Sequence, residues 1–329
     1  MKGIAVFILT IFIVLFLLWF GMWQAVSGKK IKSQEKELKG VKSTQQTLKQ
    51  EVAELKQKPS RSFSSVPEKL IFCGEEVPLE REYVKERLDE ALNFEKNRNS
   101  AIESIFKRSG RWFSFIENEL RNRSLPLDLR YLPVIESDLN PDANSNMGAR
   151  GMWQLTRGTA QRYKLRVDYL IDERYDPFKS TRAAVEHLQD LYSEFGNWSK
   201  ALATYNMDMA SFKKAVEKEK ANDFYQVRGI PLETQRFIFR ILATKMIMEH
   251  PEKYGYPREE SIEKLKYQKW QVREIDLVVE KATASRIEIV EKLKARYPDL
   301  TYWDFLTHNR HILRDLPRGK YKIYVYSEK

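Results

Sequence analysis

The chain has 329 residues, which is enough for about two domains. Its net charge of +11 favours an acidic partner, such as an anionic lipid or a carboxylate-bearing polymer, but no run interleaves aromatic and basic residues as RNA-binding segments do, so we predict no nucleic-acid partner. The single cysteine, Cys73, excludes an intramolecular disulfide framework and a cysteine-based zinc site.

The first 28 residues predict a transmembrane anchor. Residues 4–23 are apolar except for Thr10 and Gly21, and this length suits the ~30 Å of a bilayer core. A cleaved signal peptide is the alternative, because small residues at 25–27 would suit a cleavage site. Three lysines directly after the span would, by the positive-inside rule alone, leave the bulk of the chain in the cytoplasm.

Residues 29–58 predict a coiled-coil stalk that could pair two copies of the chain into a homodimer. Apolar residues occupy most a and d positions of four heptads, namely Ile31, Leu38, Val41, Leu48, Val52 and Leu55. A solitary solvated helix is the alternative. Residues 59–76, which are rich in serine, predict a linker.

Residues 77–260 predict an all-α domain. Apolar residues recur three and four positions apart in successive segments, which is the period of amphipathic helices. Glycine and proline predict the breaks, at Ser109–Gly110, Leu125–Pro126, Asp176–Pro177, Phe195–Gly196, Ile230–Pro231 and His250–Pro251.

Residues 261–329 predict a small module of order β-α-α-β. The segments 267–275 and 320–326 alternate like strands, and 277–284 and 286–296 between them are typical of helices. The histidines of this tail form no metal-binding pattern, so we predict that His308 and His311 lie at the surface and that no metal is bound.

Glu136 is the residue most indicative of chemistry. It ends the apolar run 131–135 and precedes a polar loop rich in glycine, asparagine and serine. A carboxyl group at the edge of an apolar element is disfavoured in its charged form, so its pKa should rise toward neutral pH, as a proton donor to a glycosidic oxygen requires. A solvated glutamate at a helix end would give the same sequence.

Most glycosidases use a second carboxylate, and Asp138 and Asp142 are the nearby candidates. Asp138 precedes the turn-forming residues 139–141, so capping of the backbone is its simplest role.

Residues 136–160 resemble the signature of the soluble lytic transglycosylase family, which shares the goose-type lysozyme fold. The flanking segments 108–137, 167–206 and 231–256 resemble the membrane-bound members of that family. The resemblance extends over about residues 77–256. It implies a mainly α, lysozyme-like catalytic domain that acts on peptidoglycan glycan strands without a cofactor.

The resemblance also implies roles for single residues. Glu136 corresponds to the sole catalytic acid and base of the family. The residues implied to hold or contact the glycan are Ser137, Ser145, Gly148, Ala149, Gly151, Met152, Trp153, Gln154, Tyr205 and Asn206. For Trp153, packing in the core is the alternative.

In this family one glutamate protonates the oxygen between N-acetylmuramic acid and N-acetylglucosamine. It then removes the proton from the muramic acid 6-hydroxyl, which closes onto the anomeric carbon as a 1,6-anhydro sugar. Two alternatives stay open: a hydrolytic muramidase in which Asp138 or Asp142 positions water, and a catalytically impaired wall-binding scaffold. The second arises because Asn206 is followed by 207–210, which lacks the two glycines usual in the family and adds the charge of Asp208.

Because peptidoglycan lies outside the cytoplasmic membrane, the resemblance places the catalytic domain in the periplasm of a bacterial envelope, anchored by residues 1–28. The tail faintly resembles a lysin motif at residues 316–321. Glycan binding and purely structural packing are both open for this module.

Overall fold

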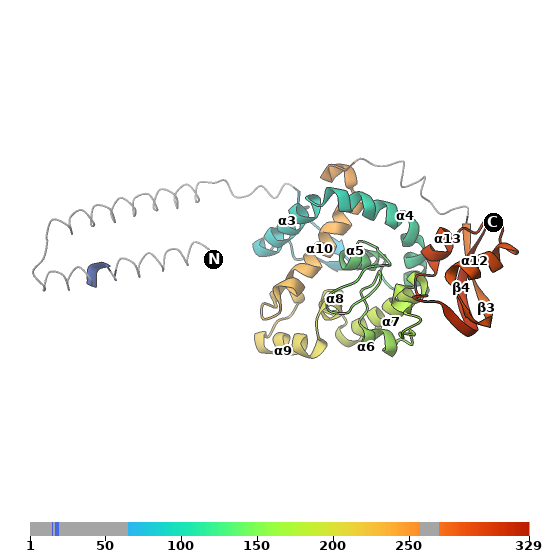
Figure 1. The fold of residues 1–329 in the computed structure, drawn as a ribbon. Coiled ribbons are helices and arrows are strands. Elements are labelled where there is room, and N and C mark those ends of the chain that lie inside the picture. Colours follow the sequence, from blue (N-terminus) through green and yellow to red (C-terminus); the bar gives the residue numbers. More distant parts are fainter. Residues whose placement is uncertain (1–14, 16, 20–64, 257–269, 329) are drawn as a thin grey trace, which may run out of the picture. The chain divides into compact units, whose positions relative to one another are not determined.

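The computed structural model describes residues 15, 17–19, 65–256 and 270–328 (Figure 1). The chain divides into two compact units, Met1–Phe63 and Ser64–Lys329. In the first unit residues 15 and 17–19 are helical, and the rest of the predicted anchor and the whole stalk lie outside the described residues. No helix among the described residues has both the length and the hydropathy to cross a bilayer.

The second unit contains a helical body, residues 65–256, and a C-terminal module, residues 270–328. The body consists of β1 (Ile71–Phe72), β2 (Glu75–Glu76), α3 (Glu82–Lys96), α4 (Asn99–Asn122), η1 (Leu127–Tyr131), α5 (Leu132–Ser137), α6 (Arg157–Arg162), η2 (Glu173–Tyr175), α7 (Pro177–Phe195), α8 (Trp198–Asn206), α9 (Met209–Glu219), η3 (Phe224–Gln226), α10 (Leu232–Glu249) and η4 (Pro251–Tyr254). The module consists of β3 (Trp270–Ala284), α12 (Arg286–Lys294), α13 (Tyr302–His308) and β4 (Leu316–Glu328). The prediction of a mainly helical protein is confirmed.

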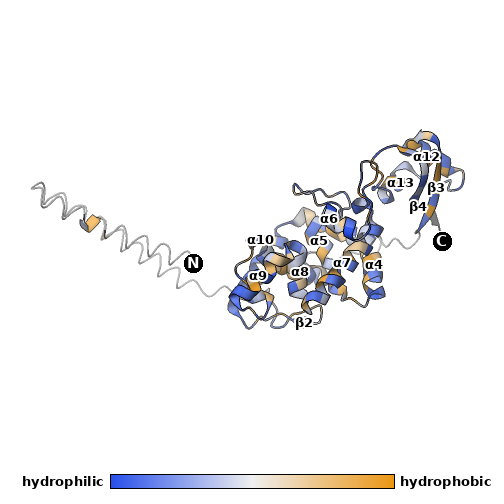
Figure 2. Cartoon of the chain, turned by 90° about the horizontal axis from the view of Figure 1, so that it is seen from below, coloured by the Kyte–Doolittle hydropathy of each residue, from blue (hydrophilic) through white to orange (hydrophobic). Residues whose placement is uncertain are grey.

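Helix α10 lies at the centre of the body, where it packs against α3, α5 and α8 (Figure 1). Its buried residues lie on several sides of the helix axis and include Phe237, Ile238, Phe239 and Ile241. A helix with buried apolar residues on several sides is typical of a core position. The outer helices are amphipathic, with hydrophilic and hydrophobic residues on the same ribbon (Figure 2). The side chains that α10 presents to α5 therefore determine what surrounds Glu136.

Most predicted breaks coincide with helix ends. Asp176 accepts hydrogen bonds from the backbone N–H groups of Phe178 and Lys179 at the start of α7, and Gly196 ends that helix with a left-handed φ of 59°. The break at Ser109–Gly110 was wrong, because α4 continues through it. The flanking apolar side chains of α4 are buried, and this burial outweighs the cost of about 1 kcal/mol for a helical glycine.

Residues 65–76, predicted as linker, belong to the folded body. Strands β1 and β2 pair antiparallel, and Phe72 is 1% exposed in the main core. Cys73 at the turn has a positive φ of 53°, and its N–H donates to an Asp128 carboxylate oxygen at 2.7 Å. Burial raises the pKa of the Cys73 thiol. The cysteine is thus a buried structural residue.

The module has the predicted order β-α-α-β, with β3 and β4 paired antiparallel. The helix predicted at 277–284 was wrong, since this segment belongs to β3. Leu277 and Val279 are each 4% exposed whereas Val278 is 43% exposed, which is the alternation of a strand with one buried face. Leu277 and Val279 pack with Ile289, Phe305 and Ile323 in a second, smaller core.

The module is joined to the body by backbone pairing and shared apolar contacts. Ile171 and Ile312 form an antiparallel bridge, and Ile171 lies in the module's core. In the reverse direction, Tyr324 of β4 lies in the core of the body. His308 and His311, predicted at the surface, are 1% and 2% exposed, because this junction covers them.

The Gly151→Ala variant should destabilise the protein. Gly151 has a φ of +76°, and a Cβ there would lie 1.8 Å from the Arg174 carbonyl oxygen. We expect a loss of roughly 3 kcal/mol in the free energy of unfolding, measured by urea denaturation. The matched control is Gly158→Ala in α6, where a Cβ meets nothing within 4 Å and a gain of about 0.5–1 kcal/mol is expected. Equal stability of the two variants would contradict this account.

Candidate active site

Glu136 lies one residue before the end of the short helix α5, where the chain reverses sharply. Asp138 and Leu139 both adopt left-handed backbone angles, with φ of 54° and 59°. Such angles cost about 1–3 kcal/mol each in residues other than glycine. Arg98 offsets this cost by binding the Asp138 carboxylate at 2.7 and 2.8 Å, and Arg108 donates to the Asp138 carbonyl at 3.0 Å. The reversal leads residues 138–155, called the site loop below, back past Glu136.

The Glu136 side chain is partly buried, and within the described residues its carboxyl group forms no hydrogen bond or ion pair. Burial, followed by the negative charge of Glu233, raises its pKa from 4.5 to about 8, while the positive charge of Arg240 opposes the rise. Glu136 is therefore protonated at neutral pH. A carboxyl group in this state can donate a proton to a bound oxygen atom.

Glu233 and Arg240 both belong to α10, and the sequence analysis assigned neither of them to the site. Arg240 binds Glu95 at 2.7 Å, and Glu95 in turn binds Arg98 at 2.8 Å. A series of ion pairs thus links α10 to the turn beside Glu136. In the sequence, residues 231–256 resemble the family, but this resemblance did not indicate that Glu233 or Arg240 lies near Glu136.

Two hydroxyl groups, one from α5 and one from α8, hold the site loop. Ser137 donates to the Met152 carbonyl at 2.7 Å, and Tyr205 of α8 donates to the Trp153 carbonyl at 2.8 Å. Burial and the neighbouring Glu136 raise the pKa of Tyr205, so its phenol keeps the proton that it donates. Tyr205 thus lies in the field of Glu136 but hydrogen bonds to the loop.

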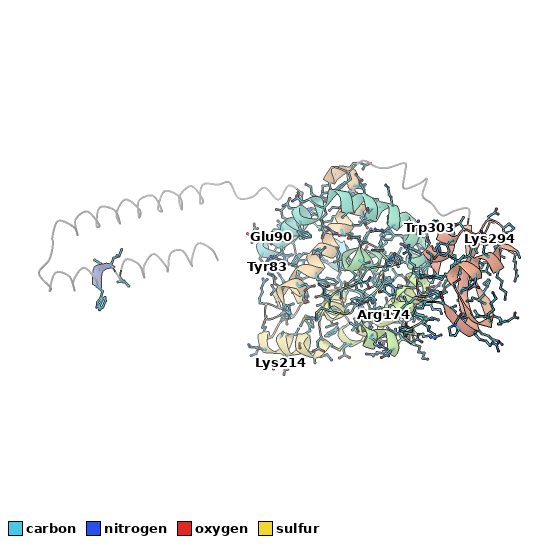
Figure 3. The ribbon with its side chains drawn as sticks, in the orientation of Figure 1. Tyr83, Glu90, Arg174, Lys214, Lys294 and Trp303 are labelled. Carbon is cyan, nitrogen blue, oxygen red and sulfur yellow. The ribbon has the colours of Figure 1, made fainter. Side chains whose placement is uncertain are left out.

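Residues 145–151 of the site loop form a compact turn. The Ser145 hydroxyl accepts from the N–H groups of Met147 and Ala149, at 3.1 Å each. Gly148 has a φ of +84°, and its carbonyl accepts from Arg174 at 2.8 Å (Arg174 is labelled in Figure 3). The turn is therefore held both from within and from η2.

The predicted residues 151–154 divide into buried and accessible ones. Met152 and Trp153 are 0% exposed, and the Trp153 indole donates to the Thr181 hydroxyl at 2.8 Å. Their side chains pack in the main core. For Trp153 this was the alternative to a contact with the glycan. Gln154 is partly buried, and its side-chain amide donates to the Gly151 carbonyl at 2.8 Å.

Asn206 and the turn after it lie at the C-terminal end of α8. The Asn206 side-chain oxygen accepts from the Thr234 hydroxyl of α10 at 2.7 Å. Residues 207–210 contain no positive φ, so this turn does not need glycine. Asp208 accepts from the Ser211 N–H at 2.8 Å, which caps α9 and lowers the pKa of Asp208.

The other two carboxylates of the site loop are engaged by arginines. Asp138 binds Arg98, as described above, and Asp142 forms an ion pair with Arg310 of the C-terminal module. Among the residues that the structure describes, no group of three His, Cys, Asp or Glu side chains has an arrangement suited to a metal ion.

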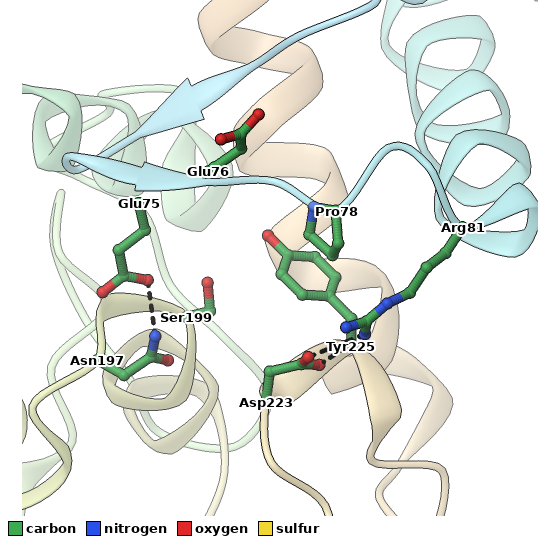
Figure 4. Close-up of a pocket in the computed structure, with 8 residues that line it drawn as sticks. All are labelled: Glu75, Glu76, Pro78, Arg81, Asn197, Ser199, Asp223 and Tyr225. Carbon is green, nitrogen blue, oxygen red and sulfur yellow. Dashed lines mark hydrogen bonds and ion pairs between the residues drawn. The ribbon is translucent and has the colours of Figure 1, made fainter.

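A separate cavity lies at the N-terminal end of α8 (Figure 4). It is lined by Glu75, Glu76, Pro78, Arg81, Asn197, Ser199, Asp223 and Tyr225. Glu75 accepts from the Asn197 amide at 2.8 Å and from the Trp198 N–H at 2.6 Å, so it caps α8. Tyr205 lies near the opposite end of the same helix, which separates this cavity from Glu136.

The surroundings of Glu136 thus define an acid-base class of site, in which one protonated carboxyl group lies beside a glycine-containing loop. Residues 113–227 match the sequence profile described as the transglycosylase SLT domain. The matched segment contains Glu136, the whole site loop and Tyr205.

The chain is homologous to curated lytic transglycosylases. It is 29% identical over 192 residues to membrane-bound lytic murein transglycosylase D of Escherichia coli (strain K12), which covers 56% of this chain and 41% of that protein. It is 32% identical over 136 residues to membrane-bound lytic murein transglycosylase F of Pasteurella multocida (strain Pm70), covering 37% of this chain and 24% of that one. The chain therefore spans less than half the length of these two relatives.

Two further matches have different descriptions. A putative tributyltin chloride resistance protein of Alteromonas sp. (strain M-1) is 34% identical over 136 residues, covering 38% of this chain and 66% of that protein. A solved structure, an inactive mutant of the lytic transglycosylase Slt from Pseudomonas aeruginosa, aligns with a TM-score of 0.37 and 20% identity, covering 44% of this chain and 24% of that chain.

Glu136→Gln should stabilise the protein in alkaline solution. Between the ordinary glutamate pKa of 4.5 and about 8, only the folded protein keeps the Glu136 proton, so its stability falls as the pH rises through this window. Gln avoids the buried charge, and we expect it to add roughly 2–4 kcal/mol at pH 9 and almost nothing at pH 4, measured by urea denaturation. Glu86→Gln at an exposed site of α3 should change neither value. Equal effects of Glu136→Gln at both pH values would refute the raised pKa.

Proposed function

We propose that the chain is a peptidoglycan lytic transglycosylase that cleaves the β-1,4 bond between N-acetylmuramic acid and N-acetylglucosamine and uses Glu136 as its single acid and base. The observation that carries the proposal is the carboxyl group of Glu136, which has a pKa of about 8 within the SLT domain. The homology to murein transglycosylases D and F supports the substrate.

Glu136 serves both halves of the reaction. Its carboxyl proton passes to the bridging oxygen, the bond from that oxygen to the muramic acid C1 breaks, and the N-acetylglucosamine end leaves as an alcohol. The resulting carboxylate takes the proton of the muramic acid 6-hydroxyl, whose oxygen bonds to C1 and closes the 1,6-anhydro ring. Glu136 ends protonated, so one group suffices and no water is consumed.

The glycan contacts that we propose are those of the site loop and α8. The turn formed by Ser145, Gly148, Ala149 and Gly151 offers backbone groups to the sugar, because nothing lies within 4 Å of the Cβ position of Gly148, which leaves room for close approach. Ser137, Gln154, Tyr205 and Asn206 complete the polar surface. Met152 and Trp153 act from beneath, through the loop carbonyls that Ser137 and Tyr205 bind.

The hydrolytic alternative is disfavoured by the ion pairs of the site loop. A hydrolase needs a carboxylate to activate water. Asp138 and Asp142 instead bind Arg98 and Arg310, and both serve to hold the loop in place. The scaffold alternative was based on the missing glycines after Asn206 and on the charge of Asp208. It is disfavoured because Asp208 caps α9 and the turn after Asn206 forms without glycine.

For the whole chain we propose an envelope enzyme with a periplasmic catalytic domain. The proposed layout is an anchor in residues 1–28, a stalk in 29–58 that pairs two copies, a catalytic domain that ends near residue 260, and the module that follows. The relatives D and F are named membrane-bound, and peptidoglycan lies outside the cytoplasmic membrane.

Digestion of purified murein sacculi tests the reaction. The wild-type chain should release fragments that end in 1,6-anhydro-muramic acid, each one water lighter by mass spectrometry than a hydrolysed fragment. Glu136→Gln should lower release by about 10³-fold, because the proton donor is removed. Asp142→Asn should release the same anhydro products. Hydrolysed ends from the wild type would establish the muramidase instead, and equally negligible release by wild type and Glu136→Gln would establish the scaffold.

The cellular placement is tested with a reporter fused after residue 329. A reporter that is active only in the periplasm should give signal with the full chain and lose it when residues 1–28 are deleted. Signal from a reporter that is active only in the cytoplasm would reject the proposed orientation.

A further inference from the structure

The C-terminal module contacts the site loop directly. Arg310, in the segment between α13 and β4, forms an ion pair with Asp142, and their side chains are 30% and 50% exposed. Arg310 lies near Arg111, and burial together with this like charge lowers the pKa of Arg310. Asp142 is the acidic partner of Arg310 on the site loop.

A second connection runs through buried groups. The Asp172 N–H donates to the His311 carbonyl of the module at 2.9 Å. The Asp172 carboxylate binds the Arg174 guanidinium at 2.9 and 2.7 Å, and both side chains are 8% exposed. Arg174 then donates to the Gly148 carbonyl at 2.8 Å. The module is therefore linked to the turn of the site loop by three successive polar contacts.

The apolar contacts give this junction a fixed position. The Tyr324 ring of β4 lies 4.8 Å from the Phe178 ring at the start of α7, measured between centroids. Ile171 of the body packs in the module's core. A module joined in this way, with side chains exchanged between the two cores, transmits its position to the segments it touches.

We propose that the C-terminal module is a positioning element of the active site, and that Arg310, through Asp142, holds the site loop in the geometry that binds the glycan for cleavage. The proposal rests on the function proposed above. In this proposal the module supports the chemical step by positioning the loop, and it does not bind the glycan itself. Arg310 is in this sense a positioning residue, since its contact is with the loop and not with the sugar.

The test is a charge reversal and its restoration in the full-length chain. Arg310→Glu places two carboxylates opposite each other, and Arg310→Glu with Asp142→Arg restores an opposite-charge pair. The control is Arg123→Glu, which reverses the Arg123–Glu186 pair of the body, of 3.2 Å and with matched exposures of 33% and 51%. Circular dichroism melts establish that each variant is folded.

The first readout is hydrogen exchange of the backbone amides of residues 142–151, which are the central part of the site loop. We expect exchange about fivefold faster in Arg310→Glu, a return to the wild-type rate in the double variant, and no change in Arg123→Glu. This readout does not need catalysis, so it separates a failure of the positioning proposal from a failure of the proposed function. Unchanged exchange in Arg310→Glu, or no return in the double variant, overturns the positioning role.

The second readout is steady-state cleavage of soluble glycan oligomers. Loss of positioning should lower kcat about 10-fold with little change in KM, and the double variant should recover kcat. If the module instead binds the glycan on its own, Arg310→Glu should raise KM and leave kcat unchanged. That outcome overturns the proposal and supports the glycan-binding role that the sequence left open.

Discussion

The site depends on the attachment of one loop to two helices. Ser137 and Tyr205 bind successive carbonyls of the loop, at Met152 and Trp153, and one of these hydroxyls follows Glu136 directly in the chain. The fully buried indole of Trp153 holds the same segment from below. The site loop and the helix that carries Glu136 are consequently fixed by the same few hydrogen bonds. A bound sugar would meet a surface that needs little reorganisation, which is the condition under which polar groups stabilise a transition state best.

Among the described residues, Glu136 has no cationic partner in direct contact, unlike three carboxylates that hold the loop and the turn beside it. Asp138, Asp142 and Glu95 all bind arginines, and these pairs fix the loop and the turn. Glu233 adds negative potential from α10 and so favours the protonated form of Glu136. The difference between these neighbouring carboxyl groups, some ion-paired and one protonated, follows from their partners and not from their residue type.

The sequence predicted the helical body well, because its helices bury apolar stripes whose period is local. Glu136 and the loop were singled out by the resemblance of residues 136–160 to the lytic transglycosylase family, and their role as a site stays a prediction. Long-range packing accounts for the failures. Val278 and Val279 belong to a strand because β4, some 40 residues away, pairs with them. His308 is buried because the module packs against the body. The charge of Glu233 raises the pKa of Glu136 because α10 packs on α5. No local pattern carries such information.

The exchange of residues between the two cores has a consequence for folding. Tyr324 completes the core of the body and Ile171 completes that of the module, so neither core is fully formed until the other is in place. The two should therefore melt as one cooperative transition. Substitutions selected for tighter packing in the module would then raise the thermal stability of the whole second unit, even where they lie far from Glu136.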